Sequence, residues 1–135
     1  MKYSIVQYNI REAFQEKKIP IGVIVQSEEG IFYKFDNSEE KFSLIKSSFP
    51  GADKGTFDNF EKTFEENFIK VDQISISDDN GNQILISKND SQFLDYLNGT
   101  YQSTYTYSKP TPLEGSEPKN YLDLIYNQQV IRNVA

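Results

Sequence analysis

Cysteine and histidine are both absent from this 135-residue chain. Without thiol groups there can be no disulfide framework, no thiolate zinc site, no iron–sulfur cluster and no cysteine nucleophile. Without imidazole groups there is no Ser-His-Asp triad, and the commonest general base and zinc ligand are missing. We therefore expect no metal site, no cofactor and no catalytic residues of these kinds.

The chain also lacks the patterns that hold nucleotides or cross membranes. Neither G-x-x-x-x-G-K nor G-x-G-x-x-G occurs, so no glycine-rich loop is present to surround a phosphate. The first residues, MKYSIVQ, contain no apolar stretch of the length that a signal peptide or a membrane span requires. The sequence predicts a soluble, cytoplasmic protein that has no contact with a membrane.

Acidic residues outnumber basic ones, with 20 Asp and Glu against 14 Lys and Arg and a net charge of −6. Nucleic-acid backbones are bound mainly through clustered Lys and Arg, so this balance argues against generic nucleic-acid binding. Aromatic residues are plentiful, and the 10 Phe and 9 Tyr supply large side chains for a core. The length predicts one domain, residues 1–135.

Short runs of β-branched and aromatic residues predict the first strands. We expect a strand over residues 3–8, a charged connection over 9–18 and an apolar central strand over 19–27. Pro20 and Gly22, near the start of that strand, indicate a bulge or twist where it enters the sheet. Residues 28–30 predict a tight hairpin turn into the next strand.

The middle of the chain mixes strand and helix patterns. Residues 41–46 alternate and are interpreted as a fourth strand, although Phe42, Ile45 and Phe49 also fit helical spacing. After a turn, Thr56 is the expected N-cap of an amphipathic helix. One face of this helix carries four phenylalanines, at positions 57, 60, 64 and 68.

The second half of the chain repeats this mixture. Residues 71–88 alternate around Asn80-Gly81, the pair that a type I′ hairpin turn prefers. A short helix is expected after Asp90, a strand over 100–108 and a final helix that opens near Pro118. The order of elements predicts an α+β fold, an antiparallel β-sheet of meander or hairpin strands packed with about three α-helices.

Two aromatic surfaces are candidates for binding a partner. The phenylalanine stripe could lie in a partner's groove, but such stripes usually form the core face of an amphipathic helix. Tyr101, Tyr105 and Tyr107 share one face of their strand. This face could pack half-buried on the sheet or contact a protein partner, because tyrosine combines an apolar ring with a polar hydroxyl.

Charged residues give three further candidates. Arg11, Lys17 and Lys18 form a small basic loop that could hold a phosphate or a carboxylate. The run from Asp78 to Asn82 resembles a calcium loop, but the ligand spacing of an EF-hand is missing and a plain hairpin turn explains the run. The many glutamates are expected to be solvated, although a paired acid and base of the glycosidase type stays open.

Several blocks of the sequence resemble the bacterial domain-of-unknown-function family 3037. They are YSIVQY with a charged loop and IPIGVIV, then KFSLIKSSFPGADKGTFDNF, and finally YSKPTP leading into NYLDLIYNQQV. The similarity runs from about Tyr3 to Val130, with Pro20 where the family has Asn. The family has no established activity, so the resemblance implies a fold and no reaction. Its members resemble accessory proteins encoded beside kinase-like proteins of persistence toxin–antitoxin pairs, which implies a protein partner.

Three functional hypotheses remain open at this point. The first is a non-catalytic binding or regulatory module that acts through a protein partner, such as a kinase-like toxin or another defence protein. The second is a phage or mobile-element inhibitor whose acidic surface mimics nucleic acid or sequesters a ligand. The third is a carboxylate-dependent hydrolase, which would need two acids facing each other in a pocket.

Overall fold

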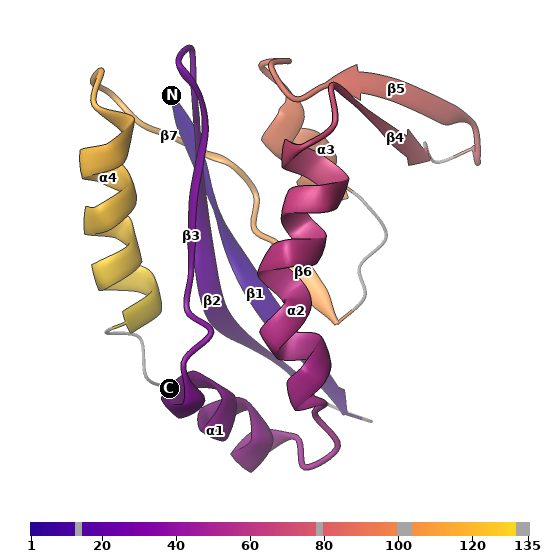
Figure 1. Cartoon of the computed structure of the whole chain (residues 1–135), viewed down its shortest axis with the longest axis vertical. Helices are drawn as coiled ribbons and strands as arrows, with labels where there is room; N and C mark the ends of the chain where they lie inside the picture. The colour runs from indigo at the N-terminus through magenta and orange to yellow at the C-terminus, as the bar shows by residue number, and fades with distance from the viewer. Residues whose placement is uncertain (13–14, 78–79, 100–103, 132–135) are drawn as a thin grey trace.

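An antiparallel sheet with strand order β3-β2-β1-β6 forms the centre of the protein, and the short β7 also pairs with β1 (Figure 1). This computed structural model describes residues 1–12, 15–77, 80–99 and 104–131. The strands of this sheet are β1 (Lys2–Glu12), β2 (Gln15–Ser27), β3 (Gly30–Phe35), β6 (Tyr105–Tyr107) and β7 (Thr111–Pro112). The predicted α+β class and antiparallel sheet are confirmed.

The first two strands form one long ribbon, so the charged connection predicted over residues 9–18 is wrong. Pairing continues from Lys2 opposite Gln26 to Glu12 opposite Gln15, and Arg11 lies opposite Glu16. Polar residues are compatible with strand here because an antiparallel sheet can expose alternate side chains to water.

The predicted bulge is confirmed, but it lies inside β2 instead of at its start. Val6 pairs with Gly22 and Gln7 with Pro20, so Ile21 is the extra residue. Pro20 is tolerated at this position because the pairing is irregular there. Gly22 lies under the ring of Phe35 in β3, and a Cβ on Gly22 would stand 2.8 Å from Phe35 Cε1 and closer still to Cδ1.

Within the described ranges four α-helices accompany the sheet, one more than the approximate number predicted, and two of them continue into π-helical segments. The helices are α1 (Glu39–Ser48), α2 (Lys54–Phe64), α3 (Phe93–Gly99) and α4 (Pro118–Ile125). The π-helical segments are η1 (Glu65–Ile69), which extends α2, and η2 (Tyr126–Ile131), which extends α4.

The additional helix is α1, which occupies the segment predicted as a fourth strand. Ser38 caps it, and its hydroxyl accepts a hydrogen bond from the Lys41 backbone N–H at 3.1 Å. Phe42 and Ile45 are buried on one helical face. The helical spacing of these residues therefore decides the structure, supported by a cap and acidic residues in the first turn.

The phenylalanine stripe of α2 and η1 faces the core, as the amphipathic pattern predicts. Phe57 and Phe64 are buried, and Phe60 and Phe68 pack partly buried against the same cluster. The predicted N-cap, Thr56, is wrong by three residues. Asp53 is the cap, because its carboxylate accepts hydrogen bonds from both the backbone N–H and the hydroxyl of Thr56.

A second, two-stranded sheet consists of β4 (Gln73–Ser77) and β5 (Gln83–Ser87). The predicted hairpin is confirmed, with Ile74 opposite Ile86 and both side chains buried. The two-residue type I′ turn at Asn80-Gly81 is wrong. The last described pair is Ser77 with Gln83, and positive φ is found at Gly81 and not at Asn80, whereas a type I′ turn requires it at both.

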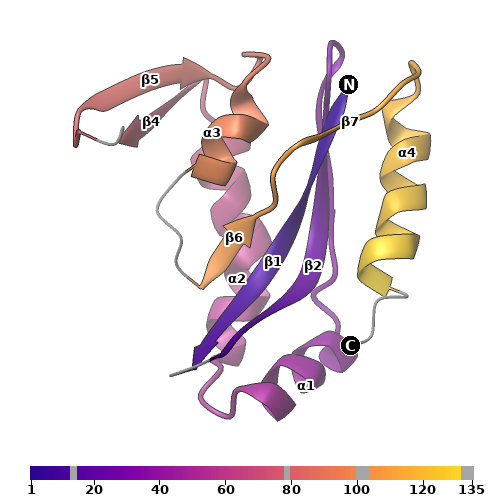
Figure 2. The same cartoon turned by 180° about the vertical axis from the view of Figure 1, so that it is seen from behind.

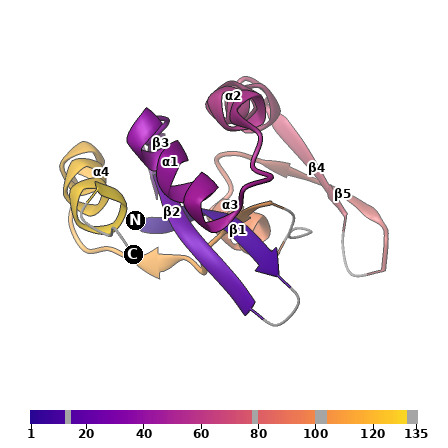
Figure 3. The same ribbon diagram turned by 90° about the horizontal axis from the view of Figure 1, so that it is seen from below.

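Helices cover both faces of the central sheet (Figure 3). The larger hydrophobic cluster lies between one face and α1, α2, α3 and the β4–β5 hairpin. The smaller cluster lies between the other face and α4 with η2. Figure 2 shows α3 and the β4–β5 hairpin on the same side of the molecule as β6. None of the helices in the described ranges is long and apolar enough to cross a membrane.

Candidate functional site

The tyrosines proposed as a partner surface pack largely inside the protein. Tyr105 stacks on Phe60, with ring centroids 4.1 Å apart and planes inclined by 13°, and meets the edge of Tyr8 at 5.3 Å. Burial raises the pKa of Tyr107, whose ring meets the edge of Phe68. Tyr101 lies outside the described residues. The structure therefore places Tyr105 and Tyr107 together, but against the α2–η1 stripe.

The basic candidates lie on the β1–β2 ribbon, and the two lysines interact with the protein itself. Lys17 Nζ donates to the Ser48 hydroxyl at 3.1 Å, which ties β2 to α1. Lys18 pairs with Glu16 on its own strand at 3.6 Å. The Arg11 backbone lies in β1, and its side chain is outside what the structure describes. Lys17 and Lys18 point to opposite faces because neighbouring strand residues alternate.

Among the residues that the structure describes, Asp36, Asp53, Glu61 and Glu65 do not form an acid–base pair across a pocket. Asp36 lies 4.0 Å from the buried Lys41, and Asp53 caps α2. Glu61 and Glu65 are one turn apart on the same side of one helical rod, so they cannot flank a substrate from opposite sides. Within the described ranges no group of three or more acidic residues is placed to hold a metal ion.

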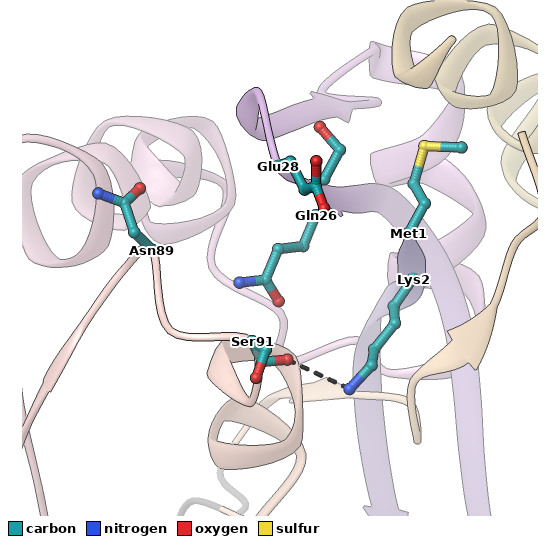
Figure 4. Close-up of a pocket in the computed structure, with 7 residues that line it drawn as sticks. Met1, Lys2, Gln26, Glu28, Asn89 and Ser91 are labelled. Atoms are coloured by element: carbon teal, nitrogen blue, oxygen red, sulfur yellow. Dashed lines mark hydrogen bonds between the residues drawn. The ribbon is translucent and has the colours of Figure 1, made fainter. Parts of the chain in front are cut away.

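A cavity of about 260 Å³ lies where β1 and β2 approach the loop between β5 and α3 (Figure 4). Its polar groups join that loop to the sheet. Lys2 Nζ donates to the Ser91 carbonyl and pairs with Asp95, both at 3.2 Å. The Gln26 side-chain amide donates to the Asp90 carbonyl, and its oxygen is buried without a partner. The Lys2 cation and the Gln26 amide N–H group thus already have partners within the protein.

The sheet ends in two edges of different character. At the β6 edge, Asn98 of α3 donates its side-chain N–H to the Tyr107 carbonyl at 2.8 Å. Backbone hydrogen bonds from Asn9 to Thr104 and from Ser108 to Ile5 show that Tyr105 and Tyr107 direct their own backbone groups away from β1. The outward carbonyl of Tyr107 therefore already accepts a hydrogen bond from Asn98, and an added strand would have to replace that bond.

The other edge is β3, and its outward backbone groups are open. Ser27 pairs with Gly30 next to the turn, and Asp36 N donates to the Ile21 carbonyl. In an antiparallel ladder these pairs alternate, so Ile31, Tyr33 and Phe35 direct their N–H and C=O groups away from β2. Among the residues that the structure describes, none donates to or accepts from these outward groups.

Two helical segments flank this open edge, and Figure 1 shows β3 running between them. Tyr33 and Phe35 contact the α2 side, where Phe35 meets the edge of Phe60 at 5.4 Å. Lys34 points to the α4 side and lies 3.4 Å from Asp123 and 4.7 Å from the Tyr126 ring.

The α2 side of the edge is acidic. Burial is the largest cause that raises the pKa of Tyr33, and the negative charges of the nearby Glu65 and Glu61 raise it further. Burial and then the neighbouring Glu65 raise the pKa of Glu61. The charge of Glu61 also contributes to the raised pKa of Tyr126 on the other side of β3. Negative charge is therefore present along the α2 side of the open edge.

Sequence reasoning did not identify this edge, because which strand lies outermost depends on pairing between distant segments. One signal was present. Lys34 interrupts the aromatic run of β3, and exposed lysine is a common feature of edge strands that protects them from uncontrolled pairing.

Comparison with known proteins adds no relative: no family model, no curated protein and no solved structure matches the chain.

Proposed function

We propose that this protein is a non-catalytic binding or regulatory module, and that a protein partner adds an extended segment to the open edge of β3. The observation that carries the proposal is the row of outward N–H and C=O groups at Ile31, Tyr33 and Phe35. Edge strands of this kind bind extended peptides through main-chain hydrogen bonds, and side-chain contacts supply specificity.

Two further features favour β3 over the other strands. The sheet behind β3 is held by helices on both faces, so the edge is a fixed template and little order has to be gained on binding. The β4–β5 hairpin also has edges, but a two-stranded ribbon is a weaker template because it has marginal stability of its own. The resemblance to family 3037 makes a kinase-like protein encoded nearby the first partner to test.

The test uses a backbone change that leaves the β2–β3 ladder intact. The Ile31 N–H points outward, so Ile31→Pro removes an edge donor without removing a ladder hydrogen bond. Ile31→Ala is the matched control, because it shortens the same half-buried side chain and keeps the N–H. Each protein is used to capture cross-linked partners from its native host, after both variants are shown to unfold at similar temperatures.

We expect wild type and Ile31→Ala to recover the same specific partner and Ile31→Pro to recover much less of it. Equal recovery by the proline and alanine variants would show that the β3 edge is not the binding surface. If no protein were recovered above background by wild type, the proposed function itself would be rejected.

A further inference from the structure

The side chains of an added strand can be assigned to the two sides of β3. In an antiparallel sheet, residues directly opposite each other project to the same face. A partner residue paired with Tyr33 therefore lies on the α2 side, beside the Tyr33 ring. Partner residues next to it in sequence lie on the α4 side, beside Phe32 and Lys34.

The α2 side has an uncompensated pair of carboxylates. Glu65 directly follows Phe64, whose ring centroid lies 5.4 Å from that of Tyr33, so this part of the helical rod lies beside the edge. Glu61 and Glu65 are both partly buried and four residues apart on this rod, a spacing at which like charges repel. Within the described ranges, neither carboxylate has a lysine or arginine within ion-pair distance. The cation of β3 itself, Lys34, is on the opposite face and pairs with Asp123.

The α4 side has mixed charge. Lys34 pairs with Asp123, and Lys119 lies over the Phe32 ring at 5.9 Å from its centroid. Charges of both signs are thus present within a short distance, so this side gives a partner no strong preference for either sign.

We infer that the partner segment is basic at one defined position: an arginine or lysine is paired with Tyr33 and places its cation at the Glu61 and Glu65 carboxylates. This inference rests on the proposed function and names the chemistry of the partner at the same edge. Arginine fits best, because its planar fork can bond to two carboxylate oxygens while its face lies on the tyrosine ring.

The first experiment selects short peptides from a displayed random library against the immobilised full chain. Selected peptides are synthesised, and protection of the Ile31, Tyr33 and Phe35 amides from hydrogen exchange shows whether each binds at β3. Among the peptides that protect these amides, we expect arginine or lysine to be enriched at one position.

The second experiment measures the affinity of one such peptide for charge variants. The double variant Glu61→Gln and Glu65→Gln is expected to bind about ten-fold more weakly, because two partly exposed ion pairs are removed. The control, Glu66→Gln with Glu114→Gln, removes the same net charge at exposed positions and is expected to bind like wild type. The first double variant should be at least as stable as wild type, because a repulsion is relieved.

The possible outcomes separate this inference from the proposed function. Peptides that protect the β3 amides without a basic preference, or that bind the Glu61 and Glu65 double variant as tightly as the control, would overturn the inference and leave the function intact. Protection of β5 amides instead, or failure to select any peptide that protects β3, would overturn both.

Discussion

Replacing Gly22 by alanine tests the packing that positions the binding edge. A Cβ at Gly22 would lie 2.8 Å from Phe35 Cε1 and 3.0 Å from the Lys34 carbonyl, whereas ordinary contacts of this kind are 3.4–4 Å. The Phe35 ring cannot move freely, because it contacts the rings of Tyr33, Phe60 and Phe64. The added methyl group must therefore displace part of β3 or of its aromatic cluster.

The size of the effect follows from two opposing contributions. Overpacking of a well-packed core costs roughly 1–3 kcal/mol. Replacing glycine by alanine restricts the unfolded chain and returns about 0.4–1 kcal/mol. We expect the free energy of unfolding to fall by about 1.5 kcal/mol, which lowers the unfolding temperature of a domain of this size by about 5 °C.

The assay is urea unfolding of wild type, Gly22→Ala, Phe35→Leu and the double variant. If the Phe35 ring is the obstacle, alanine costs much less in the Phe35→Leu background, and the two substitutions show a coupling of about 1 kcal/mol. A small residual cost is expected there from the Lys34 carbonyl. An unchanged stability of Gly22→Ala, or the same loss in both backgrounds, would refute the steric argument.

Three other predictions concern the surrounding structure. Burial, and secondarily nearby carboxylates, raises the pKa of Tyr126 from its ordinary value of 10.0 to about 12. The stability contributed by the neutral phenol is therefore complete below pH 10.0 and is lost as the pH rises toward about 12. Urea unfolding across that window should show a shallower loss for Tyr126→Phe, and an identical loss would contradict this. Ser38→Ala removes the cap of α1 and should lower the unfolding free energy by about 1 kcal/mol, and a loss near zero would argue against the cap. Lys41→Met leaves the nearly buried Asp36 carboxylate without its cation and the Val130 carbonyl without its donor, so the free energy of unfolding should fall by about 3 kcal/mol. Adding Asp36→Asn should recover part of that loss, and no recovery would exclude the ion pair as its cause.

Local patterns predicted the elements whose signals agree with each other. The phenylalanine stripe, the Glu28–Gly30 turn and the alternating β4–β5 segments were all recognisable from spacing, because each depends on neighbours within a few residues. Residues 41–46 were predicted incorrectly because strand and helix spacing both fit. The Ser38 cap and the burial of Ile45 in the tertiary core decide for helix.

The candidate site was much less accessible to sequence reasoning. The tyrosines at 105 and 107 were correctly placed on one face, but whether that face meets water or the α2–η1 stripe depends on packing between distant segments. The position of β3 at a sheet edge follows from the pairing of β1 with β6, across most of the chain length. Glu61 and Glu65 looked like ordinary surface residues until the edge beside them was known.

The sheet face under α4 is exposed to solvent during synthesis, because the strands that form it are made well before the helix that covers it. Strands β1, β2 and β3 are made first and pair through local turns, while the residues that cover Ile5, Val23 and Val25 come from α4 and η2 near the other end of the sequence. A ribosome-bound chain can therefore complete its three-stranded meander long before this apolar surface is covered. During that interval the apolar face of the meander is exposed to solvent, and a chaperone that binds apolar surfaces can bind it.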